Sequence, residues 1–130
     1  MKKYKKPIVM TLLCLIVVGI PMFIYDDLQG NFIRNYLMEK QVKEHLMESG
    51  YTEEDLLSIE ATYNMKYNTD TIKGTVAYVV FQDEPEEEYM YIQLRESGEV
   101  QQHCIYYSEE TEAYEVDYTK ERKHMIRNCY

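Results

Sequence analysis

The pattern of hydrophobic and polar positions separates the start of the chain from the rest. Residues 8–25 carry no formally charged side chain over 18 positions, and two aspartates follow them directly. A helix of that length spans about 27 Å, close to the roughly 30 Å hydrocarbon core of a bilayer. The pattern predicts a transmembrane helix over residues 7–25, held in the membrane through residues 8–25. The lysine-rich residues 1–6 predict a cytoplasmic N-terminus, because basic residues are retained on that side.

Two other interpretations of this segment stay open. A signal peptide cut after Gly19 would release the remainder of the chain, but the new N-terminus would then begin with an apolar run. Lipidation of Cys14 is disfavoured because Leu13 occupies the position before it, where a small residue is needed. We expect an uncleaved signal anchor, with secretion after cleavage as the alternative. All three interpretations export residues 26–130.

Beyond the anchor the apolar positions take a helical period. Within residues 32–49 they recur at steps of three and four, at positions 33, 37, 38, 42, 46 and 47. This spacing predicts an amphipathic helix that buries one face. Asn31 is a suitable N-cap, and Gly50 is a suitable left-handed residue after the helix. Residues 52–55 have the spacing of a capping box, which predicts a short helical turn.

The period then shortens to two, which indicates β-strands. The alternating or continuous apolar runs predict four strands, over residues 58–67, 74–81, 88–95 and 100–107. The connections between them are too short for parallel crossovers, so the predicted sheet is an antiparallel meander. A fifth, edge strand is expected over residues 114–118. Thr119 is then expected to cap a short basic helix over residues 120–128.

These elements predict an α+β fold class: an N-terminal transmembrane helix, then an amphipathic helix packed on a four- to five-stranded antiparallel meander sheet. The domain plan is a basic cytoplasmic N-terminus, a transmembrane signal anchor and one extracytoplasmic α+β domain, over residues 1–6, 7–25 and 26–130.

Charge narrows the classes of partner. All 23 acidic residues of the chain lie in residues 26–130, and four of its 14 Lys and Arg residues lie before them, which leaves this part with a formal net charge of −13. Nucleic acid is excluded as a partner, because neutralising phosphates needs clustered Lys and Arg. Charge-driven binding to an anionic membrane surface or wall polymer is disfavoured for the same reason.

The exported part contains two cysteines, Cys104 and Cys129. In an oxidising compartment they can form a disulfide, and the sequence is equally consistent with two free thiols. The three histidines are dispersed and are interpreted as surface or half-buried residues, at positions 45, 103 and 124.

Candidate chemistry is sparse. The acidic run Asp83, Glu84, Glu86, Glu87 and Glu88 suits a hard cation, but it lacks the spaced loop that forms a calcium site. A solvated hairpin tip is the simpler interpretation. No nucleophile motif, HExxH or phosphate-binding glycine loop is present, so no catalytic residue, metal or cofactor is predicted.

Two other groupings contain residue types that can act in catalysis. Glu53, Glu54 and Asp55 offer paired carboxylates, but the capped start of a helix explains them more simply. His103 adjoins Cys104, yet neighbours on a strand point to opposite faces and would not meet.

Tyrosine is unusually frequent, at 14 residues, and Trp is absent. Tyr89 and Tyr91 alternate with Met90 and Ile92 on the third predicted strand. If one of these faces is exposed, its tyrosines suit recognition of a protein, since they offer a large area with few rotors. Tyr89 and Tyr91 are therefore candidate partner-binding residues. The alternative is that both faces are buried, between the helix and the C-terminal segment.

The order of these motifs resembles a family of small, single-pass exported proteins from Gram-positive bacteria that is classed only as a domain of unknown function. The resemblance rests on the basic N-terminus and anchor, and on short motifs at 30–31, 50–51, 54–55, 63–64, 79–81 and 83–85. It implies export and one α+β domain, and it implies no activity. The helix-on-sheet order is also similar to the PepSY and cystatin-like architectures, which is a likeness of fold alone.

The sequence thus predicts a non-enzymatic, membrane-tethered module that binds or modulates a protein or peptide partner at the cell surface. A cation-binding envelope sensor and a small envelope hydrolase that uses carboxylates are the alternatives.

Overall fold

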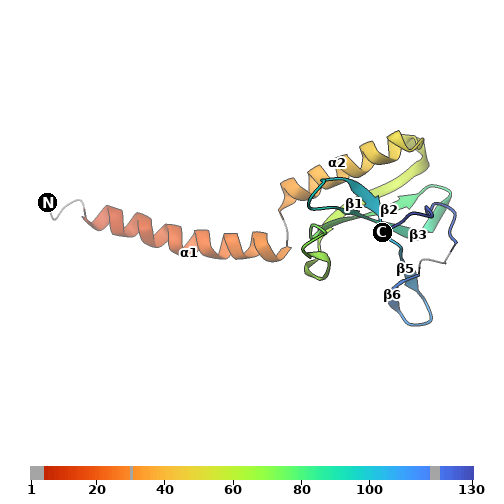
Figure 1. The fold of residues 1–130 in the computed structure, drawn as a ribbon. Coiled ribbons are helices and arrows are strands. Elements are labelled where there is room, and N and C mark those ends of the chain that lie inside the picture. The colour runs from red at the N-terminus through yellow and green to blue at the C-terminus, as the bar shows by residue number, and fades with distance from the viewer. Residues whose placement is uncertain (1–4, 30, 118–120) are drawn as a thin grey trace.

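The structure is a computed structural model that describes residues 5–29, 31–117 and 121–130 (Figure 1). Its first element is α1, Lys5–Gln29, which contains Pro21 and extends away from the rest of the molecule. In the described residues one helix is long and apolar enough to cross a membrane, over residues 5–26. A signal sequence has the same length and composition, so this helix supports the anchor and the cleaved signal alike.

The second helix, α2, spans Phe32–Glu48 and confirms the predicted amphipathic helix. Its ends have the predicted caps. The side-chain oxygen of Asn31 accepts a hydrogen bond of 2.8 Å from the Ile33 N–H. At the other end Gly50 has a φ of +100°, and the Tyr51 N–H donates back to the Leu46 carbonyl. Glycine adopts this left-handed conformation without steric penalty, which explains why the helix ends there.

The buried stripe of α2 is narrower than the sequence pattern. Met38, Val42 and Leu46 are buried, whereas Ile33 and Leu37 are 52% and 47% exposed. Only residues that fall on one side of the helix can touch the sheet beneath it, and Ile33 and Leu37 fall outside that stripe. The buried face of α2 therefore includes only part of the apolar positions that define its helical period.

Four strands form the main sheet in the order β1-β2-β3-β4, each antiparallel to its neighbour. Their bounds are Leu56–Tyr63, Thr75–Phe81, Glu84–Gln93 and Val100–Gln102. The α+β class and the meander are confirmed. A short 3-10 turn, η1 (Glu53–Asp55), precedes β1, as the capping box predicts.

The first strand ends earlier than predicted. The side chain of Asn64 accepts a hydrogen bond of 3.0 Å from the Lys66 N–H, and residues Met65–Tyr67 form the 3-10 turn η2. This local bond offers the backbone an alternative to the sheet ladder, so the alternation that continues to Tyr67 in the sequence is not strand.

The acidic run is not a long hairpin tip. Phe81 pairs with Glu84 across a turn made only of Gln82 and Asp83, and β3 starts at Glu84. The ladder register shifts at this point. Most of the run therefore lies within a strand.

The predicted fourth strand is divided. β4 ends at Gln102, and β5 (Ile105–Ser108) leaves the main sheet to pair with β6 (Ala113–Val116) in a separate two-stranded sheet. The bonds of Cys104 explain the division, because its N–H donates to the Tyr130 carbonyl rather than to a neighbouring strand.

The C-terminal helix is also corrected. Residues 121–130 contain turns and no helix. Thr119, its proposed cap, lies outside the described residues, as do the end of the predicted edge strand and the first residue of the predicted helix.

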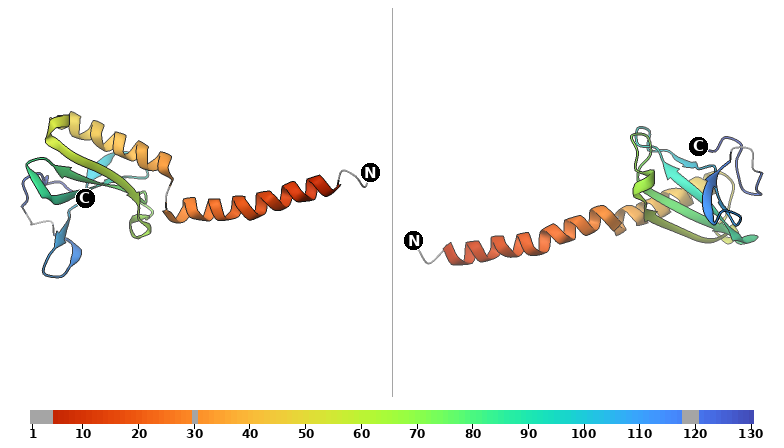
Figure 2. Two further views of the ribbon diagram at one scale, coloured as in Figure 1. Left: turned by 180° about the vertical axis from the view of Figure 1, so that it is seen from behind. Right: turned by 90° about the horizontal axis from the view of Figure 1, so that it is seen from below.

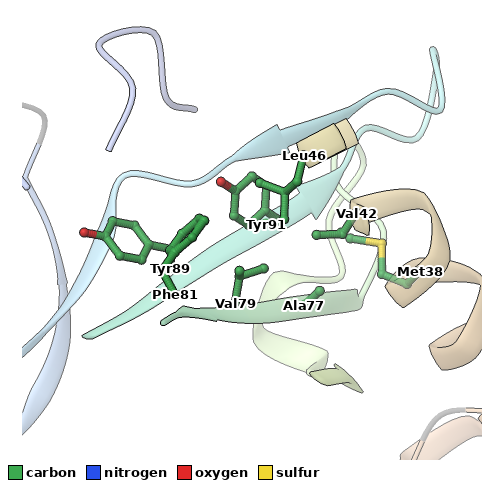
Figure 3. Close-up of a cluster of buried hydrophobic side chains, with 8 residues drawn as sticks. All are labelled: Met38, Val42, Leu46, Ala77, Val79, Phe81, Tyr89 and Tyr91. Atoms are coloured by element: carbon green, nitrogen blue, oxygen red, sulfur yellow. The ribbon is translucent and has the colours of Figure 1, made fainter. Parts of the chain in front are cut away.

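Both faces of the main sheet are covered. On one face α2 packs on a cluster that includes Val79, Phe81, Tyr89 and Tyr91 (Figure 3). On the other, Val76, Met90, Ile92 and Ile105 form a second cluster, where β5 contributes Ile105. Figure 2 shows α2 and the β5–β6 hairpin on different sides of the sheet. The sheet is thus the middle layer of the domain.

Candidate functional site

The two tyrosines expected to meet a partner are core residues. Tyr89 is 1% exposed and Tyr91 is 3% exposed. Both point into the layer between the sheet and α2, where Tyr91 lies near Leu46 and Tyr89 lies beside Phe81 (Figure 3). The alternative in which both faces of this strand are buried describes the molecule. Tyr89 and Tyr91 are therefore not available to a partner in this structure.

The hydroxyl groups of these tyrosines are held by neighbours. Tyr89 donates to Glu84 Oε2 over 2.6 Å, and the guanidinium of Arg122 lies 4.1 Å from its ring centroid. Tyr91 accepts a hydrogen bond of 3.3 Å from Gln102 Nε2. Burial is the main cause that raises the pKa of both phenols above the ordinary value. Both phenols therefore stay neutral and act as structural hydrogen-bonding groups.

The acidic run is partnered by the C-terminal segment, residues 121–130, hereafter the tail. Asp83 forms an ion pair with Lys123 at 2.6 Å, and its Oδ1 lies 2.8 Å from His124 Nε2. Arg122 binds the carboxylate of Glu87. Hydrogen bonds from Lys123 and then His124 lower the pKa of Asp83 to about 2. The run therefore serves as a docking strip for the tail, and the complementary charges were visible in the sequence.

His124 is the centre of the tail's contact with the domain. Its Nδ1 lies 3.0 Å from the Tyr51 hydroxyl and its Nε2 lies 2.8 Å from Asp83 Oδ1. The imidazole ring of His124 stacks on Phe81. The backbone N–H of His124 donates to the Tyr89 hydroxyl over 3.2 Å. A tyrosine, a histidine and an aspartate in line can relay a proton. Burial raises the pKa of the Tyr51 phenol, which favours its neutral, hydrogen-bonding form.

The cysteines form a disulfide, Cys104–Cys129, which decides between the two alternatives that the sequence left open. The bond fastens the tail close to the end of β4, where Tyr130 also donates its N–H to the Gln102 carbonyl over 2.8 Å. Cys104 is buried and cannot act as a thiol nucleophile. The candidate pair of Cys104 with His103 is thereby removed.

The paired carboxylates after α2 have structural partners. Glu53 accepts from Lys43 at 2.5 Å, and that hydrogen bond lowers its pKa. Asp55 accepts from the Thr52 N–H over 2.7 Å, as a capping residue. Among the described residues no group of three or more His, Cys, Asp and Glu side chains is arranged to hold a metal ion.

A groove of about 810 Å³ lies between α2 and β1, hereafter the α2–β1 groove. Its apolar surface includes Tyr36 of α2, which is 64% exposed, and Leu57 of β1, which is 51% exposed. Lys43 and Glu53 bridge its two walls. Sequence reasoning missed this groove. Its one signal was the adjacent pair Leu56-Leu57, since two neighbours on a strand cannot both face the same core.

β1 is an edge strand, which leaves one side of its backbone beside the groove. The Ala61 N–H points away from β2 and donates to Glu39 Oε1 over 3.1 Å. Since ladder groups alternate along a strand, Ile59 directs its N–H and C=O to the same side as Ala61. The groove therefore combines apolar side chains with backbone hydrogen-bonding groups.

Comparisons with known proteins identify the family of the chain and no more specific relative. No curated protein and no solved structure matches the chain. A family model described as "Protein of unknown function (DUF3139)" matches residues 1–91, which include α1, α2, β1 and β2 and reach into β3. The matched region contains the candidate span and the whole α2–β1 groove, and it stops before the tail. The chain therefore belongs to the DUF3139 family of proteins of unknown function.

Proposed function

We propose that this chain is a single-pass, membrane-tethered module of the Gram-positive cell surface that binds an extended segment of a partner protein in the α2–β1 groove. The observation that carries the proposal is the groove itself, where an apolar floor adjoins an edge strand. In this arrangement α1 is the tether, the N-terminus is cytoplasmic, and the domain after α1 is extracytoplasmic.

The disulfide supports export. Disulfides persist outside the reducing cytosol and are rare within it, so the Cys104–Cys129 bond fits an extracytoplasmic domain. The four lysines before the span support the same orientation. The secreted form remains the alternative, because a cleaved signal would export the same domain.

The chemistry of the groove defines its occupant. Tyr36 and Leu57 offer apolar contacts, and Ile59 offers a backbone donor and acceptor to an extended chain. Four glutamates line the groove against two lysines. An extended segment with apolar side chains and at least one basic residue is therefore the complementary ligand.

We also propose that the module is not an enzyme. The carboxylates weighed as catalysts have structural partners, and Cys104 is bonded to Cys129. The same partners argue against the two alternatives. Two members of the acidic run, Asp83 and Glu87, already pair with cations of the tail, so the run is a poor cation sensor. The carboxylates of Glu53 and Asp55 are held by structural partners, so they are poor candidates for a hydrolase.

Photo-crosslinking in intact cells tests the groove. A benzoyl-phenylalanine in place of Leu57 in the full chain is expected to give a discrete adduct with one protein, identified by mass spectrometry. A peptide that covers the crosslinked segment of that protein should then bind the purified full chain. Burial of one leucine contributes about 1.5–3 kcal/mol, so Leu57→Glu should weaken that binding by about 10-fold or more.

Leu37→Glu is the matched control. Leu37 has a similar exposure, at 47%, but lies on α2 outside the groove. It should bind the peptide like the native chain. Equal loss in both variants, or an adduct at position 37 and none at 57, would exclude the groove as the binding site.

A further inference from the structure

The end of the domain beside α1 carries a second pocket, of about 240 Å³, whose charge is opposite to that of the domain. Three cationic side chains line it: Arg34 from α2, Lys73 from the segment before β2, and Arg95 after β3. No carboxylate is among the described residues that line it. Elements far apart in the sequence therefore gather positive charge at one place, hereafter the basic pocket.

Within the described parts of the chain, no acidic side chain pairs with the cations of the basic pocket. Arg95 donates to Asn68 Oδ1 over 2.7 Å and to the Thr69 carbonyl over 3.2 Å, and Lys73 donates to Gln93 Oε1 over 3.2 Å. These acceptors are neutral. None of the ion pairs between described residues includes Arg34 or either of the other two cations. The pocket thus presents fixed positive charge to an anion.

The position of the basic pocket is set by the chain. Arg34 lies in the first turn of α2, five positions after α1 ends at Gln29. Asn31 Nδ2 donates to Asp26 Oδ2 over 3.1 Å, which ties the two helices together. All views place the segment between β1 and β2, which carries η2, next to the C-terminal end of α1 (Figures 1 and 2). The headgroup layer adds about 5–8 Å on each side of the hydrocarbon core, so a spanning α1 brings the pocket to that layer.

The start of α2 is also suited to that layer. Phe32 is 80% exposed and Ile33 is 52% exposed, in the same turn as Arg34. Apolar and aromatic side chains next to cationic ones are typical of segments that lie at a membrane interface.

We propose that the basic pocket binds the phosphate of an anionic phospholipid headgroup. Arginine suits this ligand because its planar guanidinium matches phosphate oxygens, and Lys73 adds a point charge. The net charge of −13 argues against an anionic surface for the domain as a whole, but the fold places these three cations where a lipid would meet them. This inference depends on one part of the proposed function, the role of α1 as a membrane tether. It does not depend on the α2–β1 groove.

Native mass spectrometry of the full chain in neutral detergent tests the pocket, with phosphatidylglycerol, phosphatidylcholine or inorganic phosphate added. The native chain should retain phosphatidylglycerol in preference to phosphatidylcholine. Loss of one charge-assisted contact should weaken phosphatidylglycerol binding by about 10-fold in Arg34→Gln and in Lys73→Gln. Arg34→Lys keeps the charge and should recover part of the binding. Arg34 is exposed and without an ion pair among the described residues, so its variants should fold.

Lys123→Gln is the matched control, because Lys123 pairs with Asp83 in the turn at the opposite end of the sheet. It should bind phosphatidylglycerol like the native chain. Equal retention of the two lipids, or equal loss in Lys123→Gln and Arg34→Gln, overturns the proposal. Inorganic phosphate that displaces phosphatidylglycerol at equal concentration overturns the assignment to a lipid.

Extraction of membranes with alkaline carbonate separates this inference from the tether. A chain that carbonate releases contradicts the anchor on which both proposals depend. A chain that resists carbonate but shows no effect of Arg34→Gln contradicts the basic pocket alone. Leu57→Glu should leave lipid binding unchanged, because Leu57 lies in the α2–β1 groove.

Discussion

The imidazole of His124 is stacked on the ring of Phe81, with the ring centroids 3.9 Å apart and the planes 21° apart. Phe81 ends β2 and is fully buried, while His124 belongs to the tail. The tail is therefore part of the domain's packing, although it lies outside the region that the family model matches. The stack and the disulfide hold the tail at two places.

Replacement of His124 should measure the energy of that contact. His124→Ala loses the stack and the hydrogen bonds to Tyr51 and Asp83, and should lower the free energy of unfolding by about 1–3 kcal/mol. Denaturant unfolding of the full chain in detergent, followed by near-ultraviolet circular dichroism of the tyrosines, is the measurement. His124→Phe keeps the ring and should recover part of the loss. If His124→Ala unfolds like the native chain, the tail does not stabilise the domain.

Stability should fall in acid through Asp83. Hydrogen bonds from Lys123 and His124 lower its pKa from an ordinary 3.8 to about 2 in the folded state. A lowered folded pKa means that the ionised carboxylate stabilises the fold above about pH 4, and that this contribution is lost as the pH falls from about 4 to about 2. Asp83→Asn should therefore lower Tm at neutral pH and flatten the dependence of Tm on pH across that window.

Glu86→Gln is the control for this pH dependence, since Glu86 is exposed and has no described partner in an ion pair. Its curve should follow that of the native chain. If Tm of Asp83→Asn falls in acid as steeply as that of the native chain, other carboxylates cause the acid sensitivity.

Loss of the disulfide should release the tail. The bond closes a loop with a sequence separation of 25, for which the chain-entropy model gives about 3–4 kcal/mol of stabilisation. Cys129→Ser should lower the free energy of unfolding, measured with denaturant, by that amount. Trypsin should also cleave the variant faster after Arg122 and Lys123. Reductant should lower the stability of the native chain to that of the variant and leave the stability of the variant unchanged. If reductant changes neither the stability nor the tryptic cleavage of the native chain, the bond does not hold the tail.

Truncation of Tyr91 should test its place in the core. Tyr91→Ala removes a buried ring beneath α2 and should lower the free energy of unfolding by about 3–5 kcal/mol. Tyr36→Ala is the counterpart on the surface, at 64% exposure, and should change stability by about 0.5 kcal/mol or less. If Tyr91 instead lay on an exposed partner-binding face, Tyr91→Ala would cause little loss of stability.

Local patterns predicted most elements of this fold. The caps at Asn31 and Gly50 delimit α2 as expected, because their hydrogen bonds involve residues only a few positions away. The candidate span and the order of the first three strands also follow from local periodicity. The predicted strands were wrong at Asn64 and Cys104. At Asn64 a side-chain hydrogen bond to the Lys66 N–H replaces the strand pairing, and at Cys104 the backbone N–H donates to the distant Tyr130.

The sites depended on contacts that no local pattern contains. The sequence by itself determined an apolar segment, an amphipathic helix and a meander, because each rests on the spacing of neighbouring side chains. Only the tertiary structure decided that Tyr91 is buried, since that depends on α2 covering its face of the sheet. It likewise decided that Arg34 and Arg95 share one pocket within an acidic domain. Net charge is a sum over the chain, whereas recognition depends on which charges the fold brings together.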